Sequence, residues 1–284
     1  MILVTGAGGN VGGALVAQLQ ASGIPFRAAY HSAEDARKAA KEGIDAVAVE
    51  MAAPSTVRAA LDGVSRVFLL GAMSPEQVRN ESNVVEAAIS AGVEHIVKQS
   101  LWRADEELTP IARLHRPVER LLEESAVDWT FLRANFYMQT FSRNWADSIR
   151  SANIFSSPLI RGPIAFVDVA DVAAVALRAL TEDGHAGKAY ALTGPEALTY
   201  DQTASVLSDV LGRVITYQGM TNEQALSVLP QFGVPVFEAE ALVGVCNFYL
   251  DEGAETVTTT VAEITGRPPT SFREFAEANR DLFA

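Results

Sequence analysis

The chain has little of several residue types, and each shortage excludes a class of protein. A single cysteine, Cys246, allows neither an internal disulfide nor a paired-cysteine metal or redox site. Basic residues number 22 against 35 acidic ones, and this net charge of −13 repels a phosphate backbone, which excludes nucleic acid as an expected partner. No apolar run reaches the roughly 18 residues of a membrane span. The opening MILVTGAGG lacks the basic region of a signal peptide, so we expect a cytoplasmic enzyme or sensor with no membrane partner; a homodimer is compatible with the sequence.

What the chain does contain is a repeated alternation of short apolar strands and amphipathic helices. Such alternation at these intervals predicts right-handed βαβ units and an α/β fold, a Rossmann-type doubly wound parallel sheet with helices on both faces. The expected strands are residues 2–5, 25–30, 45–50, 65–71, 94–100 and 128–134, and the expected helices are residues 10–22, 32–43, 55–63, 74–92 and 117–126.

The alternation weakens after about residue 140, and from residue 199 the sequence pattern is mostly that of helices. TYDQ, TNEQ and SFRE each place Ser or Thr three residues before Gln or Glu, as helix starts do. Ligands of open α/β folds bind beyond the carboxyl ends of the strands, so we expect a cleft between two lobes. The predicted division is an NAD(P)-binding Rossmann domain of residues 1–140, to which 163–195 return, and a smaller helix-rich, substrate-binding lobe of residues 141–162 and 196–284.

Glycines cluster where the first strand meets the first helix. Gly6, Gly9 and Gly12 have the spacing G-x-x-G-x-x-G, and Gly8 adds G-x-G. Without a Cβ the backbone can approach a diphosphate, and the helix start at Asn10 and Val11 offers free N–H groups at the positive end of its dipole. We expect Gly12 to let the helix pack closely on the sheet. No G-K-[ST] follows, which excludes a P-loop.

The end of the second strand indicates which dinucleotide binds. An acid there would bind the ribose hydroxyls of NAD, and a basic residue would accept the 2′-phosphate of NADP. The strand ends at Tyr30 and continues into His31 and Ser32, without a carboxylate. Arg37 and Lys38 either help to hold a phosphate or form a solvated helix face. We therefore expect NADP(H) to be favoured over NAD(H).

At this point the sequence resembles a known family. TGAGGNVG is similar to the phosphate loop of the short-chain dehydrogenase/reductase superfamily, and later stretches resemble its atypical NmrA-like branch. AAISAGVEHIVKQS resembles that branch's fourth helix and fifth strand, and LHRPVERLLEESAVDWTFLRANFYMQTF its H-x-x-x-E helix and sixth strand. The resemblance covers nearly the whole chain, most strongly residues 1–212. Members include quinone reductases, triphenylmethane dye reductases and redox-sensing regulators, so the resemblance implies NAD(P) binding.

The resemblance also implies positions for the cofactor. The family often has an arginine for the 2′-phosphate near the position of His31, and this departure bears on the NADP preference. Relatives place the cofactor ribose after the fourth strand and the nicotinamide beside the ends of the fifth and sixth strands. The residues at those places are Gly71, Ala72 and Met73 for the ribose, and Ser100, Asn135, Phe136 and Tyr137 for the nicotinamide.

The catalytic pair of ordinary short-chain dehydrogenases is absent. They use Tyr-x-x-x-Lys, in which the lysine lowers the tyrosine pKa for proton transfer. None of the six tyrosines has a lysine four residues later, and the lysines stand only at 38, 41, 98 and 188. Hydride transfer to a quinone, a cationic dye or a conjugated carbonyl tolerates this absence, because such acceptors take hydride readily.

Three side chains are candidates for catalysis. His115 precedes Pro117 at an expected helix start, whose dipole favours the neutral imidazole; alternatively His115 caps the helix or bonds Glu119. Tyr137 is the second candidate for a proton donor, or it packs against the C-terminal lobe. Ser100 is the third, or it bonds the backbone or the cofactor amide.

Aromatic residues gather in the sequence around the expected cleft. We expect Trp102, Phe136, Tyr137, Phe141 and Trp145, with Met138, either to stack on a flat substrate or to form ordinary core. Asp168 and Asp171 suit a helix start better than a metal site, so no metal is expected.

The sequence leaves two main functions open. The first is an NAD(P)H-dependent reductase of aromatic, quinone-like or conjugated carbonyl substrates. The second is a non-catalytic NADP(H)-binding redox sensor, which can lack a catalytic acid and keep the glycines. An epimerase or dehydratase is disfavoured by the missing Tyr-x-x-x-Lys pair.

Overall fold

The computed structural model describes residues 1–284, which form two compact units. None of the helices combines the length and the apolar character that crossing a membrane requires. Unit 1 comprises Met1–Asp105, Ala112–Arg133 and Val172–Tyr190, and unit 2 comprises Glu106–Ile111, Ala134–Asp171 and Ala191–Ala284.

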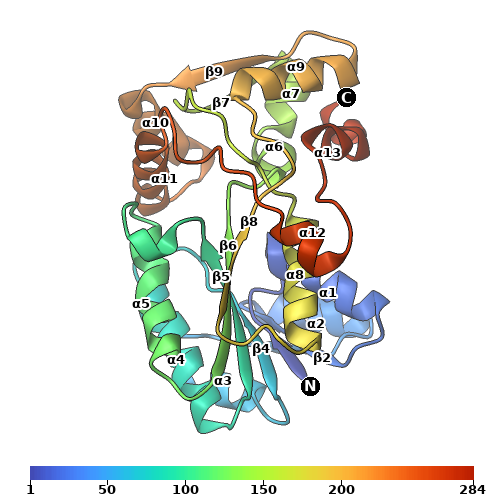
Figure 1. Ribbon diagram of the computed structural model, residues 1–284, viewed down its shortest axis with the longest axis vertical. Coiled ribbons are helices and arrows are strands. Elements are labelled where there is room, and N and C mark those ends of the chain that lie inside the picture. Colours follow the sequence, from blue (N-terminus) through green and yellow to red (C-terminus); the bar gives the residue numbers. More distant parts are fainter. The chain divides into compact units, whose positions relative to one another are not determined.

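A seven-stranded sheet in the order β3-β2-β1-β4-β5-β6-β8 runs through unit 1 (Figure 1). The pairs β2/β3, β1/β2, β1/β4 and β4/β5 are parallel, so the predicted Rossmann-type sheet is confirmed. The chain adds β2 and β3 on one side of β1 and β4 onward on the other, so the carboxyl ends of β1 and β4 form the switch point where such sheets bind ligands. The strands are β1 (Ile2–Val4), β2 (Phe26–Tyr30), β3 (Ala46–Ala48), β4 (Arg66–Leu69), β5 (His95–Leu101), β6 (Asp128–Ala134) and β8 (Lys188–Leu192).

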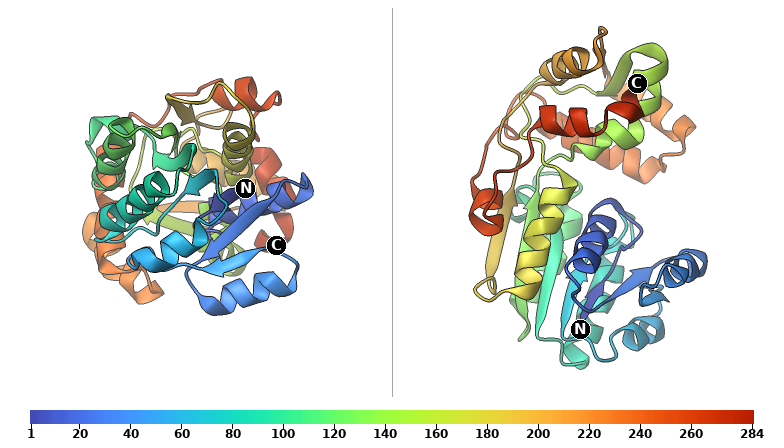
Figure 2. Two further views of the ribbon diagram at one scale, coloured as in Figure 1. Left: turned by 90° about the horizontal axis from the view of Figure 1, so that it is seen from below. Right: turned by 90° about the vertical axis from the view of Figure 1, so that its right-hand side faces the viewer.

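Helices cover both faces of this sheet, as Figures 1 and 2 show. One face carries α3, α4 and α5, and the other carries α1, α2 and the part of α8 that belongs to unit 1. Their bounds are α1 (Asn10–Ala21), α2 (Ala33–Lys41), α3 (Pro54–Ala60), α4 (Gln77–Ser90), α5 (Ala112–Glu123) and α8 (Val169–Thr181).

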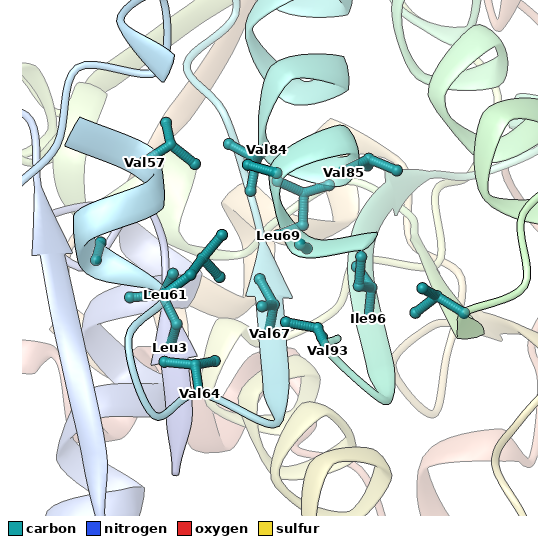
Figure 3. Close-up of a cluster of buried hydrophobic side chains, with 14 of the residues drawn as sticks. Leu3, Val57, Leu61, Val64, Val67, Leu69, Val84, Val85, Val93 and Ile96 are labelled. Carbon is teal, nitrogen blue, oxygen red and sulfur yellow. The ribbon is translucent and has the colours of Figure 1, made fainter. Parts of the chain in front are cut away.

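The core of unit 1 lies between the sheet and the α3–α5 face (Figure 3). The β4 run Val67–Leu69 is fully buried, as expected for a parallel strand covered on both sides. Helical residues at i, i+3 and i+4 spacing meet it from α3 and α4. The core residues labelled in Figure 3 are Leu3, Val57, Leu61, Val64, Val67, Leu69, Val84, Val85, Val93 and Ile96.

Unit 2 contains a two-stranded parallel sheet of β7 (Ile154–Pro158) and β9 (Thr216–Met220), and many short helices. The capping boxes predicted at Thr199, Thr221 and Ser271 are confirmed, each with reciprocal side-chain and backbone hydrogen bonds. The remaining helices are η1 (Ala104–Glu106), which begins in unit 1, and α6 (Gln139–Asn144), α7 (Ala146–Ala152), α9 (Tyr200–Leu211), α10 (Asn222–Val228), η2 (Leu229–Phe232), α11 (Val236–Phe248), α12 (Thr260–Thr265), α13 (Phe272–Ala278) and α14 (Arg280–Phe283).

Two predicted helix starts are wrong. The helix expected from Ser74 begins at Gln77, because the Gln77 N–H closes a turn onto the carbonyl of Ser74 and the Gln77 side chain turns inward instead of capping. The helix expected from Pro117 begins five residues earlier, at Ala112, and contains that proline. A proline typical of the first helical position misled the second prediction.

Candidate functional site

The glycine loop joins β1 to α1 and is tied to the end of β4. Gly6 has φ +64°, a left-handed conformation that favours glycine, and its carbonyl accepts the N–H of Gly9 at 2.9 Å. The Thr5 hydroxyl lies 3.1 Å from the carbonyl oxygens of Phe68 and Leu70, and it accepts the N–H of Leu70 at 2.8 Å. Thr5 therefore fixes the loop at the switch point of the sheet.

Gly12 makes the closest approach in this loop. A Cβ at Gly12 would lie 2.1 Å from the carbonyl oxygen of Gly6 and 2.6 Å from its carbon, so no other residue fits without moving the backbone. Gly12 thus packs helix α1 onto its own loop; the contact with the sheet that the sequence suggested is made at Gly6, where a Cβ would lie 3.0 Å from the carbonyl of Leu70.

The start of α1 has no protein partner for its N–H groups. Its N-cap residue is Gly9, which forms no side-chain cap, and the first turn contains no acidic residue. Gly8 and Gly9 are exposed, and the Oδ1 atom of Asn10 is buried without a hydrogen-bond partner. Free amides at a helix N-terminus, bare glycine backbone and no competing carboxylate are what the diphosphate of a dinucleotide requires, so these residues fit that group.

The end of β2 carries the residues expected near the adenosine ribose. His31 is exposed, and its Nδ1 lies 3.5 Å from Oε2 of Glu50. Ser32 is the N-cap of α2, and its hydroxyl accepts the N–H groups of Glu34 and Asp35 at 3.1 and 3.3 Å. His31 is therefore paired with a carboxylate, Glu50, that the sequence analysis did not expect beside it.

The loop after β4 is held from behind by a buried carboxylate. Glu81 on α4 accepts the N–H of Gly71 through Oε1 at 2.9 Å. A Cβ at Gly71 would lie 3.0 Å from Cγ of Glu81, so a side chain there would collide with its support. Ala72 is exposed and Met73 is partly buried.

The other oxygen of Glu81 belongs to a fully buried ion pair. Nζ of Lys98, in the middle of β5, lies 2.5 Å from Oε2 of Glu81, and both side chains have 0% exposure. The same Nζ lies 3.1 Å from the carbonyl of Gln99 and 3.3 Å from Nδ1 of His115. An ammonium group has three N–H donors and no acceptor, so all three of its hydrogens have a partner.

These contacts determine the state of His115. Because an ammonium only donates, Nδ1 accepts, and the neutral ring carries its hydrogen on Nε2. Burial and then the charge of Lys98 lower the pKa of His115 well below its ordinary value, so the imidazole is neutral at pH 7. Nε2 forms no hydrogen bond within the protein, and it keeps some solvent-exposed surface. It is the ring nitrogen that remains for a ligand.

The expected alternative partner of His115, Glu119, is engaged elsewhere. Glu119 is buried and accepts the Ser100 hydroxyl at 2.7 Å. It also accepts Nε and Nη2 of Arg133 at 3.0 and 2.8 Å and Nη1 of Arg116 at 3.1 Å. The Ser100 hydrogen is therefore directed at Glu119, which leaves only the oxygen lone pairs of Ser100 for another group.

The residues after β6 belong to unit 2. The Asn135 side chain donates to the carbonyl of Ala254 and accepts the N–H of Phe136, both at 2.9 Å, so its amide is occupied internally. Tyr137 forms a backbone bridge to Val167, and burial raises the pKa of its phenol. Asp168 accepts the Ala170 N–H at the start of α8, a capping contact, and no three His, Cys, Asp or Glu residues are grouped to hold a metal ion.

Two of the predicted substrate contacts are core residues of unit 2. Phe141 has no exposed surface and packs edge-on against Trp145, Phe155 and Phe272. Met138 is buried as well. The structure therefore gives Phe141 and Met138 the packing role that the sequence had left as the alternative to stacking on a substrate. Trp102, a buried residue of unit 1, and Trp145 stay predictions.

Sequence reasoning missed Glu81 and Lys98. Lysine in the interior of an apolar strand, as in HIVKQSL, is the available signal, since a charge there needs a buried partner. The partner lies 17 residues earlier in the chain, on a helix whose polar positions look like an ordinary solvated face.

Comparison with known proteins identifies the class. The NmrA-like family model matches residues 1–276, so the chain belongs to the NmrA-like family. An NAD(P)H azoreductase of Xenophilus azovorans is 35% identical over 284 residues, 100% of this chain and 99% of that protein. A (4-alkanoyl-5-oxo-2,5-dihydrofuran-3-yl)methyl phosphate reductase of Streptomyces griseus is 36% identical over 287 residues, 100% and 99% of the two chains.

Solved structures give particular neighbours. The NADPH-dependent quinone oxidoreductase QOR2 of Escherichia coli, complexed with NADPH, has a TM-score of 0.85 at 28% identity and covers 100% of both chains. The Citrobacter sp. triphenylmethane reductase, complexed with NADP(H), has a TM-score of 0.87 at 26% identity and covers 98% of this chain and 100% of that one.

The buried pair predicts a non-additive effect on stability. Glu81→Gln keeps an oxygen for the Gly71 N–H but leaves Lys98 without its carboxylate, and breaking a buried pair from one side costs about 3–5 kcal/mol of unfolding free energy. The double variant Glu81→Gln/Lys98→Met removes both charges and is expected to be more stable than Glu81→Gln alone.

Urea unfolding of the single and double variants measures this difference. Glu86→Gln, on the exposed face of the same helix, is the control and is expected within about 0.5 kcal/mol of the wild type. A Glu81→Gln variant as stable as the wild type would show that the pair contributes nothing.

Proposed function

We propose that this protein is an NAD(P)H-dependent oxidoreductase that delivers hydride to quinone-like, azo-dye, cationic-dye or conjugated carbonyl compounds. The observation that carries the proposal is the open start of α1 behind a loop in which only glycine fits at position 12. Such a start offers free amides to a diphosphate.

The printed names of the relatives support the class of reaction. They are an NAD(P)H azoreductase, a reductase of an oxo-dihydrofuran, a quinone oxidoreductase and a triphenylmethane reductase. These substrates share a conjugated, electron-poor centre that accepts hydride.

The dihydronicotinamide, when bound, supplies the hydride. The chain's own residues then have to bind, orient and donate hydrogen bonds. His115 offers a neutral Nε2–H to the oxygen or nitrogen that gains charge, and we propose it as the hydrogen-bond donor. Ser100 offers only lone pairs, so we propose that it accepts from the carboxamide N–H of the cofactor instead of acting as an acid.

We propose NADP(H) as the favoured cofactor. The strand β2 ends without a carboxylate, and two structural neighbours are complexes with NADPH or NADP(H). His31 would face the 2′-phosphate. The carboxylate of Glu50 opposes this preference because it repels the phosphate and competes for His31.

Turnover separates a reductase from a redox sensor. NADPH and NADH are titrated by fluorescence, and each acceptor class is then screened for cofactor oxidation at 340 nm. A reductase binds the cofactor and oxidises it with at least one acceptor. Tight binding without oxidation by any acceptor would contradict the enzyme and favour the sensor.

Replacing Gly9 tests the diphosphate site without harming the fold. Gly9 has φ −87° and ψ −176°, the extended conformation of an N-cap, and a Cβ there would lie 3.2 Å from the Gly6 carbonyl oxygen, which requires a small shift. In Gly9→Asp the carboxylate would cap α1 and occupy the amides that the diphosphate needs. We expect unfolding stability to be maintained and NADPH affinity to fall at least about 100-fold, as about 2.7 kcal/mol of lost binding would give.

Gln20→Asp adds the same charge at the exposed far end of α1 and serves as the control. Calorimetric titration of both variants with NADPH provides the comparison. Equal affinities for Gly9→Asp and Gln20→Asp would exclude this loop as the diphosphate site.

Removing the carboxylate beside His31 tests the cofactor preference. In Glu50→Gln the imidazole of His31 loses its competing carboxylate, and an exposed pair of this kind contributes about 0.2–1 kcal/mol. We expect the NADPH-to-NADH affinity ratio to rise by up to about fivefold, with Glu42→Gln, at the exposed residue that follows α2, as the control. A ratio that falls or stays constant would place the 2′-phosphate away from His31.

A further inference from the structure

The buried ammonium of Lys98 is not used by hydride transfer itself, although it contacts the proposed hydrogen-bond donor. We propose that Lys98 is a proton reservoir that refills His115: as Nε2 of His115 gives its proton to the reduced substrate, Nζ of Lys98 gives a proton to Nδ1. This inference rests on the proposed function and adds the source of the proton.

A neutral imidazole needs such a source. It has one N–H, and loss of that proton without replacement would leave an imidazolate, a strong base in a buried site. With the Nδ1–Lys98 contact at 3.3 Å, the ring can lose a proton from Nε2 and gain one at Nδ1 in the same event. The imidazole stays neutral throughout and only changes tautomer.

Lys98 is the charged side chain that contacts Nδ1 of His115. Glu119, one turn further along α5, is occupied by Ser100, Arg133 and Arg116. Glu81 faces Lys98 from α4 and fixes its Nζ at 2.5 Å. Glu81 therefore acts as a positioning residue, and through its second oxygen it also holds the Gly71 loop.

The proton balance closes over one cycle. Hydride transfer to a neutral acceptor leaves an anion on oxygen or nitrogen. An O–H or N–H bond forms there as the Nε2–H bond of His115 breaks, and an Nδ1–H bond forms as an Nζ–H bond of Lys98 breaks. The substrate anion and the ammonium are both neutralised, and the neutral amine of Lys98 still donates a hydrogen bond to the Glu81 carboxylate until it regains its proton. After product release, Nε2 takes a proton from water, which leaves as hydroxide into the solvent, and the Nδ1 proton returns to Lys98, so each cycle consumes one solvent proton.

The two classes of acceptor separate this relay from hydride transfer. An azo dye becomes a basic nitrogen anion and needs a proton, whereas a triarylmethane cation becomes a neutral product and needs none. The measured quantity is the ratio of azo to cation kcat. General acid catalysis contributes about 10²–10⁴-fold, so removal of the relay is expected to lower the ratio at least about tenfold.

Two variants remove the relay in different ways. The double variant Glu81→Gln/Lys98→Met removes both charges of the ion pair and so avoids an uncompensated buried charge. Lys98→Arg keeps a positive donor facing Nδ1, but a guanidinium does not release its proton in proteins. Lys188→Met, at an exposed position on β8, is the control and is expected to keep the wild-type ratio.

The tautomer of His115 gives a second readout that needs no cofactor. Ring ¹⁵N NMR of the unliganded protein is expected to show a neutral His115 with hydrogen on Nε2. This tautomer is expected to persist in Lys98→Arg and to give way to a mixture in Glu81→Gln/Lys98→Met, with His95 as an internal reference.

The outcomes are distinguishable. A fall in the ratio in both variants, with the Nε2–H tautomer kept in Lys98→Arg, supports the relay. A wild-type ratio in Lys98→Arg, or a His115 protonated on Nδ1 in the unliganded wild type, would overturn the relay and leave the reductase intact. Absence of turnover with every acceptor would overturn the proposed function itself.

Discussion

The contact between Gly12 and the carbonyl of Gly6 is the constraint on which the rest of the site depends. Because Gly12 has no Cβ, the first turn of α1 can pack directly on its own loop. A Cβ there would lie 2.1 Å from the carbonyl oxygen of Gly6. The uncapped start of α1 thereby follows directly on the exposed Gly8 and Gly9. Thr5 fastens the same loop to the end of β4, so the candidate anion site is tied to the switch point of the sheet.

A second network, formed by the buried side chains of Glu81 and Lys98, holds the Gly71 loop and the His115 ring in place. Lys98 and Glu81 form a pair whose desolvation has to be offset by close geometry and by further hydrogen bonds, and each has them. The pair links two parts of the candidate site, because Glu81 holds the loop at Gly71 and Lys98 sets the tautomer of His115. The chain has no Tyr-x-x-x-Lys pair, and the donor that we propose in its place is a neutral histidine with an ammonium behind it.

Features governed by local patterns could be predicted from the sequence, and features governed by distant partners could not. The alternation of strands and helices predicted the parallel sheet, and β6 was predicted with its observed bounds. The capping box at Thr199 formed as expected because its hydrogen bonds lie within four residues of one another. The partner of His115 was misjudged, since Lys98 reaches it from a strand and Glu119 from its own helix is drawn to Arg133. Phe141 was equally undecided, because aromatic residues look the same in sequence whether they line a ligand site or a core.

The central claim is that the backbone amides at the start of α1 bind the diphosphate of a nicotinamide dinucleotide. Amide ¹H–¹⁵N NMR during a titration with NADPH tests it most directly. The account predicts that the amides of Gly9, Asn10, Val11 and Gly12 shift together and saturate with the binding isotherm, as donors do when they gain an anionic acceptor. Saturated binding that leaves these four amides unmoved would contradict it.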